Sequence, residues 1–233
     1  MRDYRMAVGN SLKGKIGELG FFLFRIIEIN KTIEAKHIRH DYPLNQEMDA
    51  LNYYFSAFLN ALQSIKDACQ TSMNIKVSWA TISPTYGSFI FYCRNATTHD
   101  GSHMINAGQG VKNYILGPLQ RIDNHGKLIK FDPPKEDIVS LCCNLLAEIL
   151  GNIKLVIQKH GEKIPTPNEI DFKKSIESSL NSDFIPDYVK EMIKANKENI
   201  FSSFNGVNIN ICKQVCDAIE SIESSLLARD ART

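Results

Sequence analysis

The sequence predicts an all-α protein: an up-and-down bundle of about four helices, with a small β-hairpin insertion and extra C-terminal helices. Two observations predict this class. Apolar residues recur every three to four positions over several long segments, which is the period of an α-helix. The helix breakers Pro43, Pro84 and Pro133 lie between those segments, and strand-like patterning is confined to a short stretch before Pro133.

The first two helices are the most strongly patterned part of the chain. One is expected from about residue 12 to 39, where Phe22, Ile26 and Ile29 recur at helical spacing. The next is expected from about residue 44 to 71. Its apolar residues form a seam typical of antiparallel helix packing: Leu44, Met48, Leu51, Phe55, Phe58, Leu62, Ile65 and Cys69.

A third helix is expected to begin after Ser83 and Pro84 and to end at Asp100 and Gly101. Its predicted buried side consists of Tyr86, Phe89, Ile90 and Cys93. A polar loop over residues 102 to 110 follows. Residues 114 to 116 and 128 to 131 then flank a turn typical of a β-hairpin, Asp123-Asn124-His125-Gly126.

A long apolar helix from about residue 135 to 160 completes the predicted bundle. Gly161, Pro165 and Pro167 mark a boundary, so we predict a helical bundle over residues 1–162 and a helical extension over 163–233. About three helices are expected in the extension, near residues 168–180, 186–201 and 208–228. The last one has an apolar stripe that must pack on the bundle or on a second copy.

Charge is nearly balanced, with 27 lysines and arginines, 26 aspartates and glutamates and a net charge of +1. No global field therefore draws in nucleic acid, and any RNA contact has to come from a local patch. Lys112 and Arg121 are the candidate RNA-binding residues.

The six cysteines include no C-x-x-C pair, so buried, reduced thiols are expected. The first residues lack the apolar core of a signal peptide. The apolar run over residues 19 to 29 is too short to cross a bilayer and carries Arg25 and Glu28. These features predict a cytoplasmic protein with no membrane span.

Arg94, Asn95 and His99 lie at the end of the third helix. Asn95 and His99 are four residues apart and share a face, whereas Arg94 is about 140° around the axis from His99. The guanidinium must therefore wrap toward the imidazole, or the two groups must meet across a symmetry axis between two copies of the chain.

This Arg-Asn-x-x-x-His spelling resembles the active-site motif of the HEPN superfamily, all-helical proteins many of which are metal-independent endoribonucleases acting as dimers. The resemblance implies a homodimer that brings two Arg-His pairs into one cleft, an RNA substrate and no metal or other cofactor. It also implies a toxin–antitoxin or phage-defence setting, with an antitoxin or other partner protein.

In this interpretation His99 is the general acid or base, Arg94 holds the scissile phosphate and Asn95 orients the imidazole or a phosphate. RNA suits such a site because its own 2′-hydroxyl is the nucleophile.

Two alternatives stay open. His99 and Asp100 resemble the metal-binding pair of the HD phosphohydrolases, which need further ligands. The candidates for these ligands are His37, His40, His103, Asp123 and Asp137. In the other alternative Arg94 pairs with a carboxylate, His99 caps the helix, and the protein is a dimerising, adaptor or RNA-binding module without catalysis.

Overall fold

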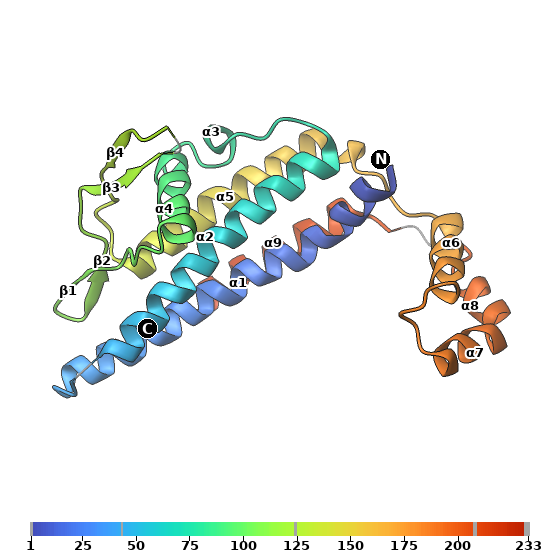
Figure 1. Cartoon of the computed structure of the whole chain (residues 1–233), viewed down its shortest axis with the longest axis horizontal. Coiled ribbons are helices and arrows are strands. Elements are labelled where there is room, and N and C mark those ends of the chain that lie inside the picture. The colour runs from blue at the N-terminus through green and yellow to red at the C-terminus, as the bar shows by residue number, and fades with distance from the viewer. Residues whose placement is uncertain (1, 43, 124, 207–208, 231–233) are drawn as a thin grey trace.

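The computed structural model describes residues 2–42, 44–123, 125–206 and 209–230, and within these ranges it is helical apart from two small antiparallel hairpins (Figure 1). The predicted all-α fold with a small β insertion is confirmed. The long helices that form the body of the molecule are α1 (Arg2–Ile38), α2 (Asn45–Met73), α5 (Ile138–His160) and α9 (Ile211–Asp230).

The antiparallel pair α1 and α2 is the spine of the bundle. The predicted seam of α2 is buried from Leu51 to Cys69, whereas on α1 Ile26 is buried and the predicted Phe22 and Ile29 are only partly buried. The chain reverses through His40, whose φ of 57° is left-handed. Helix α1 begins at Arg2, earlier than predicted, because Arg5 anchors its first turns: its Nη2 donates to the Ser72 carbonyl oxygen at the end of α2 (3.0 Å). The polar start of α1 is thus held by the partner helix.

Helix α9 lies parallel to α1 and closes the bundle. Gly9 faces Ile211 and Gly20 faces Ile222, so both helices advance by the same number of residues between these contacts. A Cβ on Gly20 would lie 2.9 Å from Ile222 Cδ1, which shows that glycine permits this close approach. The apolar stripe of the last helix therefore packs on the bundle of its own chain.

The motif helix α4 (Gly87–His99) is short and stands across the long helices in Figure 1, so α9 rather than α4 supplies the fourth long member. A single turn, α3 (Trp79–Ile82), precedes it. Glu148 of α5 fixes the connection: it accepts hydrogen bonds from Ser83 Oγ (2.5 Å) and the Thr85 N–H (2.9 Å). Burial raises the pKa of Glu148, but these hydrogen bonds outweigh it and hold the pKa below its ordinary value.

The β insertion consists of two hairpins. In the first, β1 (Ala107–Gln109) pairs with β2 (Lys112–Tyr114); in the second, β3 (Leu119–Ile122) pairs with β4 (Leu128–Phe131). The predicted turn around residues 123–126 lies between β3 and β4, with Asn124 outside the described residues.

The predicted pairing of residues 114 to 116 with β4 is wrong. Tyr114 pairs with Ala107, and β4 pairs with β3 instead. Ile115 explains the difference, because it is 3% exposed and belongs to the core rather than to a hairpin arm. The predicted loop over residues 102 to 110 likewise ends in β1.

Two buried asparagines anchor this insertion to the bundle. Asn52 of α2 accepts from the N–H of Ile105 (2.9 Å) and donates to its carbonyl oxygen (3.1 Å), so one side chain satisfies both backbone groups of that residue. Asn113 of β2 donates to Asn30 of α1 (2.8 Å). The loop after α4 and the first hairpin are thereby held in place.

Helix α5, with the 3₁₀ turn η1 (Gly161–Lys163), is the one segment of the described chain that is long and apolar enough to cross a bilayer. Core helices of soluble proteins share this property, and α5 places its apolar stripe in the bundle core. Among the cysteines, Cys69, Cys93 and Cys142 are buried, and burial raises the pKa of the Cys69 thiol to about 12.

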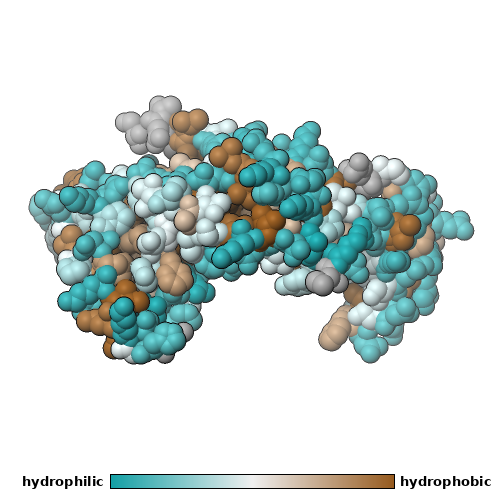
Figure 2. All heavy atoms as spheres, turned by 90° about the horizontal axis from the view of Figure 1, so that it is seen from above, coloured by the Kyte–Doolittle hydropathy of each residue, from teal (hydrophilic) through white to brown (hydrophobic). Residues whose placement is uncertain are grey.

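Helices α6 (Glu169–Leu180), α7 (Asp187–Ala195) and α8 (Lys197–Ser203) lie beyond one end of the bundle (Figure 1). The predicted helix over residues 186–201 is in fact α7 and α8, which meet at Asn196. None of the three has a fully buried residue, and Figure 2 shows apolar atoms on the surface of this end. Its large exposed apolar side chains are Ile170, Phe184, Tyr188 and Met192.

Asp171 of α6 forms an ion pair with Arg2 of α1, which connects this end to the bundle and depends on pH. Its hydrogen bond from Arg2 (2.9 Å), followed by one from the Asn168 N–H, lowers its pKa to about 2. A lowered pKa stabilises the fold above the unfolded-state pKa, and the contribution is lost as the pH falls through the folded value. In urea unfolding, Asp171→Asn is expected to be less stable than the wild type at pH 6, with most of the difference gone at pH 2. A difference as large at pH 2 as at pH 6 would contradict the ion pair as the cause.

Candidate active site

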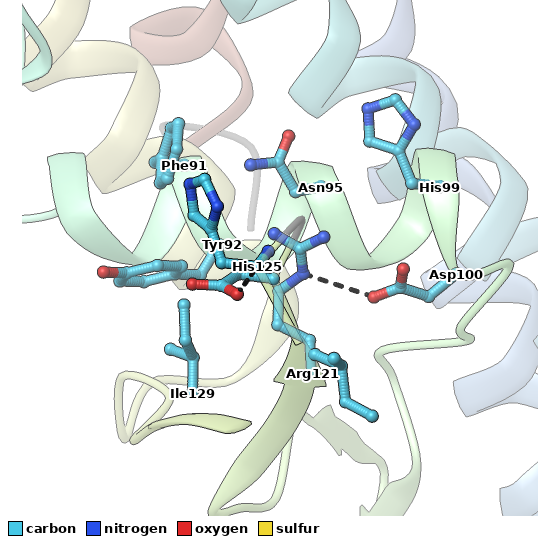
Figure 3. Close-up of a pocket in the computed structure, with 10 residues that line it drawn as sticks. Phe91, Tyr92, Asn95, His99, Asp100, Arg121, His125 and Ile129 are labelled. Carbon is cyan, nitrogen blue, oxygen red and sulfur yellow. Dashed lines mark hydrogen bonds and ion pairs between the residues drawn. The ribbon is translucent and has the colours of Figure 1, made fainter. Parts of the chain in front are cut away.

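A groove of about 530 Å³ lies between α4 and the β3–β4 hairpin (Figure 3). It is lined by Phe91, Tyr92, Asn95, His99, Asp100, Arg121, Ile122, Asp123, His125 and Ile129. Its volume falls within the ~300–1,000 Å³ of typical small-molecule sites.

Helix α4 forms one wall because its residues at four-residue spacing share a face. Phe91, Asn95 and His99 follow one another along this stripe over about 12 Å of helix axis. The opposite side of the helix is core, where Ile90 and Cys93 are fully buried. The apolar half of α4 thus orients the polar half toward the hairpin.

The hairpin brings Arg121 to this wall. Arg121 Nε lies 3.3 Å from Asp100 Oδ2, and only 7% of the arginine side chain is exposed. At the turn, Asp123 Oδ1 accepts from the N–H groups of His125 and Lys127, both at 2.9 Å. These hydrogen bonds, with smaller contributions from the Lys127 and Arg121 charges, lower the pKa of Asp123. The backbone of His125 and of Lys127 is thus tied to the Asp123 carboxylate.

Arg94 lies outside the lining of this groove. Its Nε donates to Asn60 Oδ1 of α2 (3.2 Å) and its Nη1 to Asn95 Oδ1 (3.1 Å). Thr98 Oγ1 also donates to Asn60 Oδ1 (3.2 Å). Because Arg94 holds the Asn95 oxygen, the amide nitrogen of Asn95 is the group directed toward the groove, where Figure 3 shows it between Phe91 and His99.

Of the sequence-predicted site residues, Asn95, His99 and Arg121 meet at the groove, whereas Arg94 and Lys112 do not line it. Lys112 lies on β2, with its Nζ 3.3 Å from Asp137 Oδ2 at the start of α5. The arginine that lines the groove together with Asn95 and His99 is therefore Arg121, from a segment remote in sequence from the motif.

His125, Tyr92 and Asn60 belong to the site but were not predicted from the sequence. His125 is visible in the sequence only as part of a turn, and the side on which a hairpin turn falls is a tertiary property. Asn60 sits on a helix face with no distinguishing pattern. Tyr92 could have been predicted, because it lies two residues before Arg94 and an aromatic ring beside such a motif is available for stacking.

The groups proposed as metal ligands are dispersed. His103 Nδ1 lies 3.8 Å from Asp49 Oδ1, His37 Nδ1 is hydrogen-bonded to the Tyr42 hydroxyl (2.9 Å), and Asp137 caps α5. In the described part of the chain, no three His, Cys, Asp or Glu side chains form a group that could hold a metal ion. The HD-type ligand set is thus not assembled there.

The asparagine partners of Arg94 also differ from the carboxylate expected in the non-catalytic alternative, and Asp100 rather than His99 is the C-cap of α4. Comparison of the chain with protein-family models, with curated proteins and with solved structures finds no match.

Proposed function

We propose that this protein is a HEPN-like, metal-independent endoribonuclease whose groove between α4 and the β3–β4 hairpin binds and cleaves an RNA strand. One observation carries the proposal: two imidazoles, a guanidinium and a side-chain amide line a single groove of nucleotide-binding size. These groups are His99, His125, Arg121 and Asn95. They suffice for phosphodiester cleavage when the substrate brings its own nucleophile.

The chemistry is acid–base catalysis at one phosphodiester. One imidazole takes the proton of the ribose 2′-hydroxyl, and the 2′-oxygen attacks the adjacent phosphorus. The other imidazole gives a proton to the 5′-oxygen, which leaves as the P–O bond breaks. The products are a 2′,3′-cyclic phosphate and a 5′-hydroxyl. Arg121 offers its remaining N–H groups to the phosphoryl oxygens, whose negative charge grows in the transition state.

The motif implies that Arg94 holds the scissile phosphate. In this proposal Arg94 instead acts on a neighbouring side chain. Through its hydrogen bond to Asn95 Oδ1 it orients the amide that faces the groove, so it is a positioning residue. The HEPN-like homodimer is compatible with this role, because a partner copy can add a second set of groups to the cleft. Cytoplasmic toxin or phage-defence activity, with an antitoxin or other partner, belongs to the same proposal.

The test is cleavage of single-stranded RNA by the purified protein in excess chelator. We expect cleavage to persist and to leave 2′,3′-cyclic phosphate ends. Arg121→Ala is expected to reduce the rate by about 100-fold, the scale of one lost transition-state hydrogen-bond donor, and Arg94→Ala by less. Intact RNA under all conditions would refute the enzyme, and a rate restored only by divalent metal would refute the metal-independent mechanism.

A second candidate function is a non-catalytic interaction module. The observation that favours it is a group of exposed apolar side chains: Tyr188 and Met192 share a face of α7, and Phe184, in the turn before α7, is 96% exposed. Self-association of the chain without any RNA cleavage in the same assay would select this function.

A further inference from the structure

The groove has two chemically different ends. Phe91, Tyr92, Ile129 and the His125 imidazole gather at one end in Figure 3, and His99 and Asp100 stand at the other. Asn95 lies between them on the shared stripe of α4. A ligand that fills this groove therefore needs an apolar, flat part and a polar part, joined over a short distance.

The aromatic end is partly rigid and partly open. The Tyr92 ring stacks on Phe131 of β4, with centroids 5.4 Å apart and planes 30° apart, so its position is set by the hairpin. Phe91 contacts Tyr92 edge-on at 5.3 Å and keeps 46% of its surface exposed. A rigid ring beside a half-exposed ring forms a platform on which another flat ring can stack.

The charges at the polar end limit how strongly the groove can attract a phosphate. Arg121 is paired with Asp100, and Asp123 lies near enough to feel its charge. A guanidinium flanked by two carboxylates attracts a phosphate only weakly, and the chain as a whole carries a charge of just +1. Binding of an RNA strand therefore has to draw on contacts other than phosphate attraction.

We propose that Phe91 and Tyr92 form a nucleobase subsite, so that the groove takes an unpaired nucleotide of single-stranded RNA. The base stacks on the aromatic end, the Asn95 amide donates to an acceptor on the base or ribose, and the phosphate lies toward Arg121 and His99. This inference rests on the proposed function and names its substrate class. A duplex is excluded because its bases are stacked on each other and their faces are not available to the protein.

The experiment measures binding of labelled oligonucleotides that cannot be cleaved because every ribose is 2′-deoxy. Three probes are compared by fluorescence anisotropy: a single strand, the same strand with abasic residues, and the duplex. We expect the single strand to bind about tenfold or more tightly than the other two, which is the scale of stacking one base. Few phosphate contacts should also give a shallow salt dependence.

Phe91→Ala is the decisive variant, and Phe21→Ala is its matched control because Phe21 is also half-exposed (50%) but lies on α1 away from the groove. Phe91→Ala is expected to bind the single strand as weakly as the wild type binds the abasic strand, whereas Phe21→Ala should bind like the wild type. Equal affinities of the intact and abasic strands, or unchanged binding by Phe91→Ala, would overturn the subsite.

The outcomes also separate this subsite from the catalytic proposal. Base-dependent binding of a single strand without any cleavage of the matching RNA would support the subsite and refute the enzyme. Cleavage that is insensitive to Phe91→Ala and equal on paired and unpaired RNA would support the enzyme and refute the subsite.

Discussion

Replacing His99 by alanine is expected to reduce RNA cleavage by about 100- to 10,000-fold, the range that one general acid or base contributes. The fold should be unaffected, because the residue is exposed at the last turn of α4 and its ring contributes to no core contact. The measurement is the initial rate of cleavage in excess chelator, with the melting temperature of the variant recorded beside it.

His103→Ala is the matched control, since this histidine is also exposed, lies four residues further on and faces Asp49 rather than the groove. Its rate should equal that of the wild type. If His99→Ala cleaves RNA at the wild-type rate, His99 is not a catalytic residue and the proposed mechanism in this groove is wrong. A large drop in melting temperature would instead assign His99 a structural role.

Asn52→Leu is expected to lower the free energy of unfolding by about 3 kcal/mol, because leaving a buried donor or acceptor without a partner costs ~1–3 kcal/mol each. Asn52 is 6% exposed and satisfies both the N–H and the carbonyl oxygen of Ile105, which is itself buried. Leucine has the same branching and the same number of side-chain heavy atoms, so the substitution removes the hydrogen bonds with a small change of shape. Urea unfolding monitored by circular dichroism measures the difference.

Asn10→Leu on the exposed side of α1 is the control for the asparagine-to-leucine exchange itself, and it should change stability by less than about 0.5 kcal/mol. A loss below about 1 kcal/mol for Asn52→Leu would show that the loop after α4 relaxes so that water replaces the side chain. In that case the loop would not be the rigid link between His99 and the first hairpin that its hydrogen bonds indicate.

The helices of the bundle were predictable because burial repeats with the helical period. Leu51, Phe55 and Phe58 of α2 are all fully buried, as their spacing indicates. The hairpin pairing was not predictable, because residues 114 to 116 and β3 are both short and both patterned like strands. The pairing was decided by burial: Ile115 packs in the core, and β3 is therefore the strand that pairs with β4.

The candidate site divides in the same way. Asn95 and His99 share a face of α4 because four residues make about one helical turn, and the sequence alone predicts this. No local sequence pattern predicts which segment packs opposite this face of α4. Arg121 and His125 reach it from a hairpin, and Asn60 draws Arg94 toward α2.

By itself, the sequence determined the helical class and the faces of the individual helices, because both depend on periodic burial within one segment. The tertiary structure alone decided which arginine lines the groove with His99 and that α9 covers α1. The physical reason is that these contacts join segments far apart in the chain, so their selection depends on the packing of the whole core and not on the preferences of any one segment.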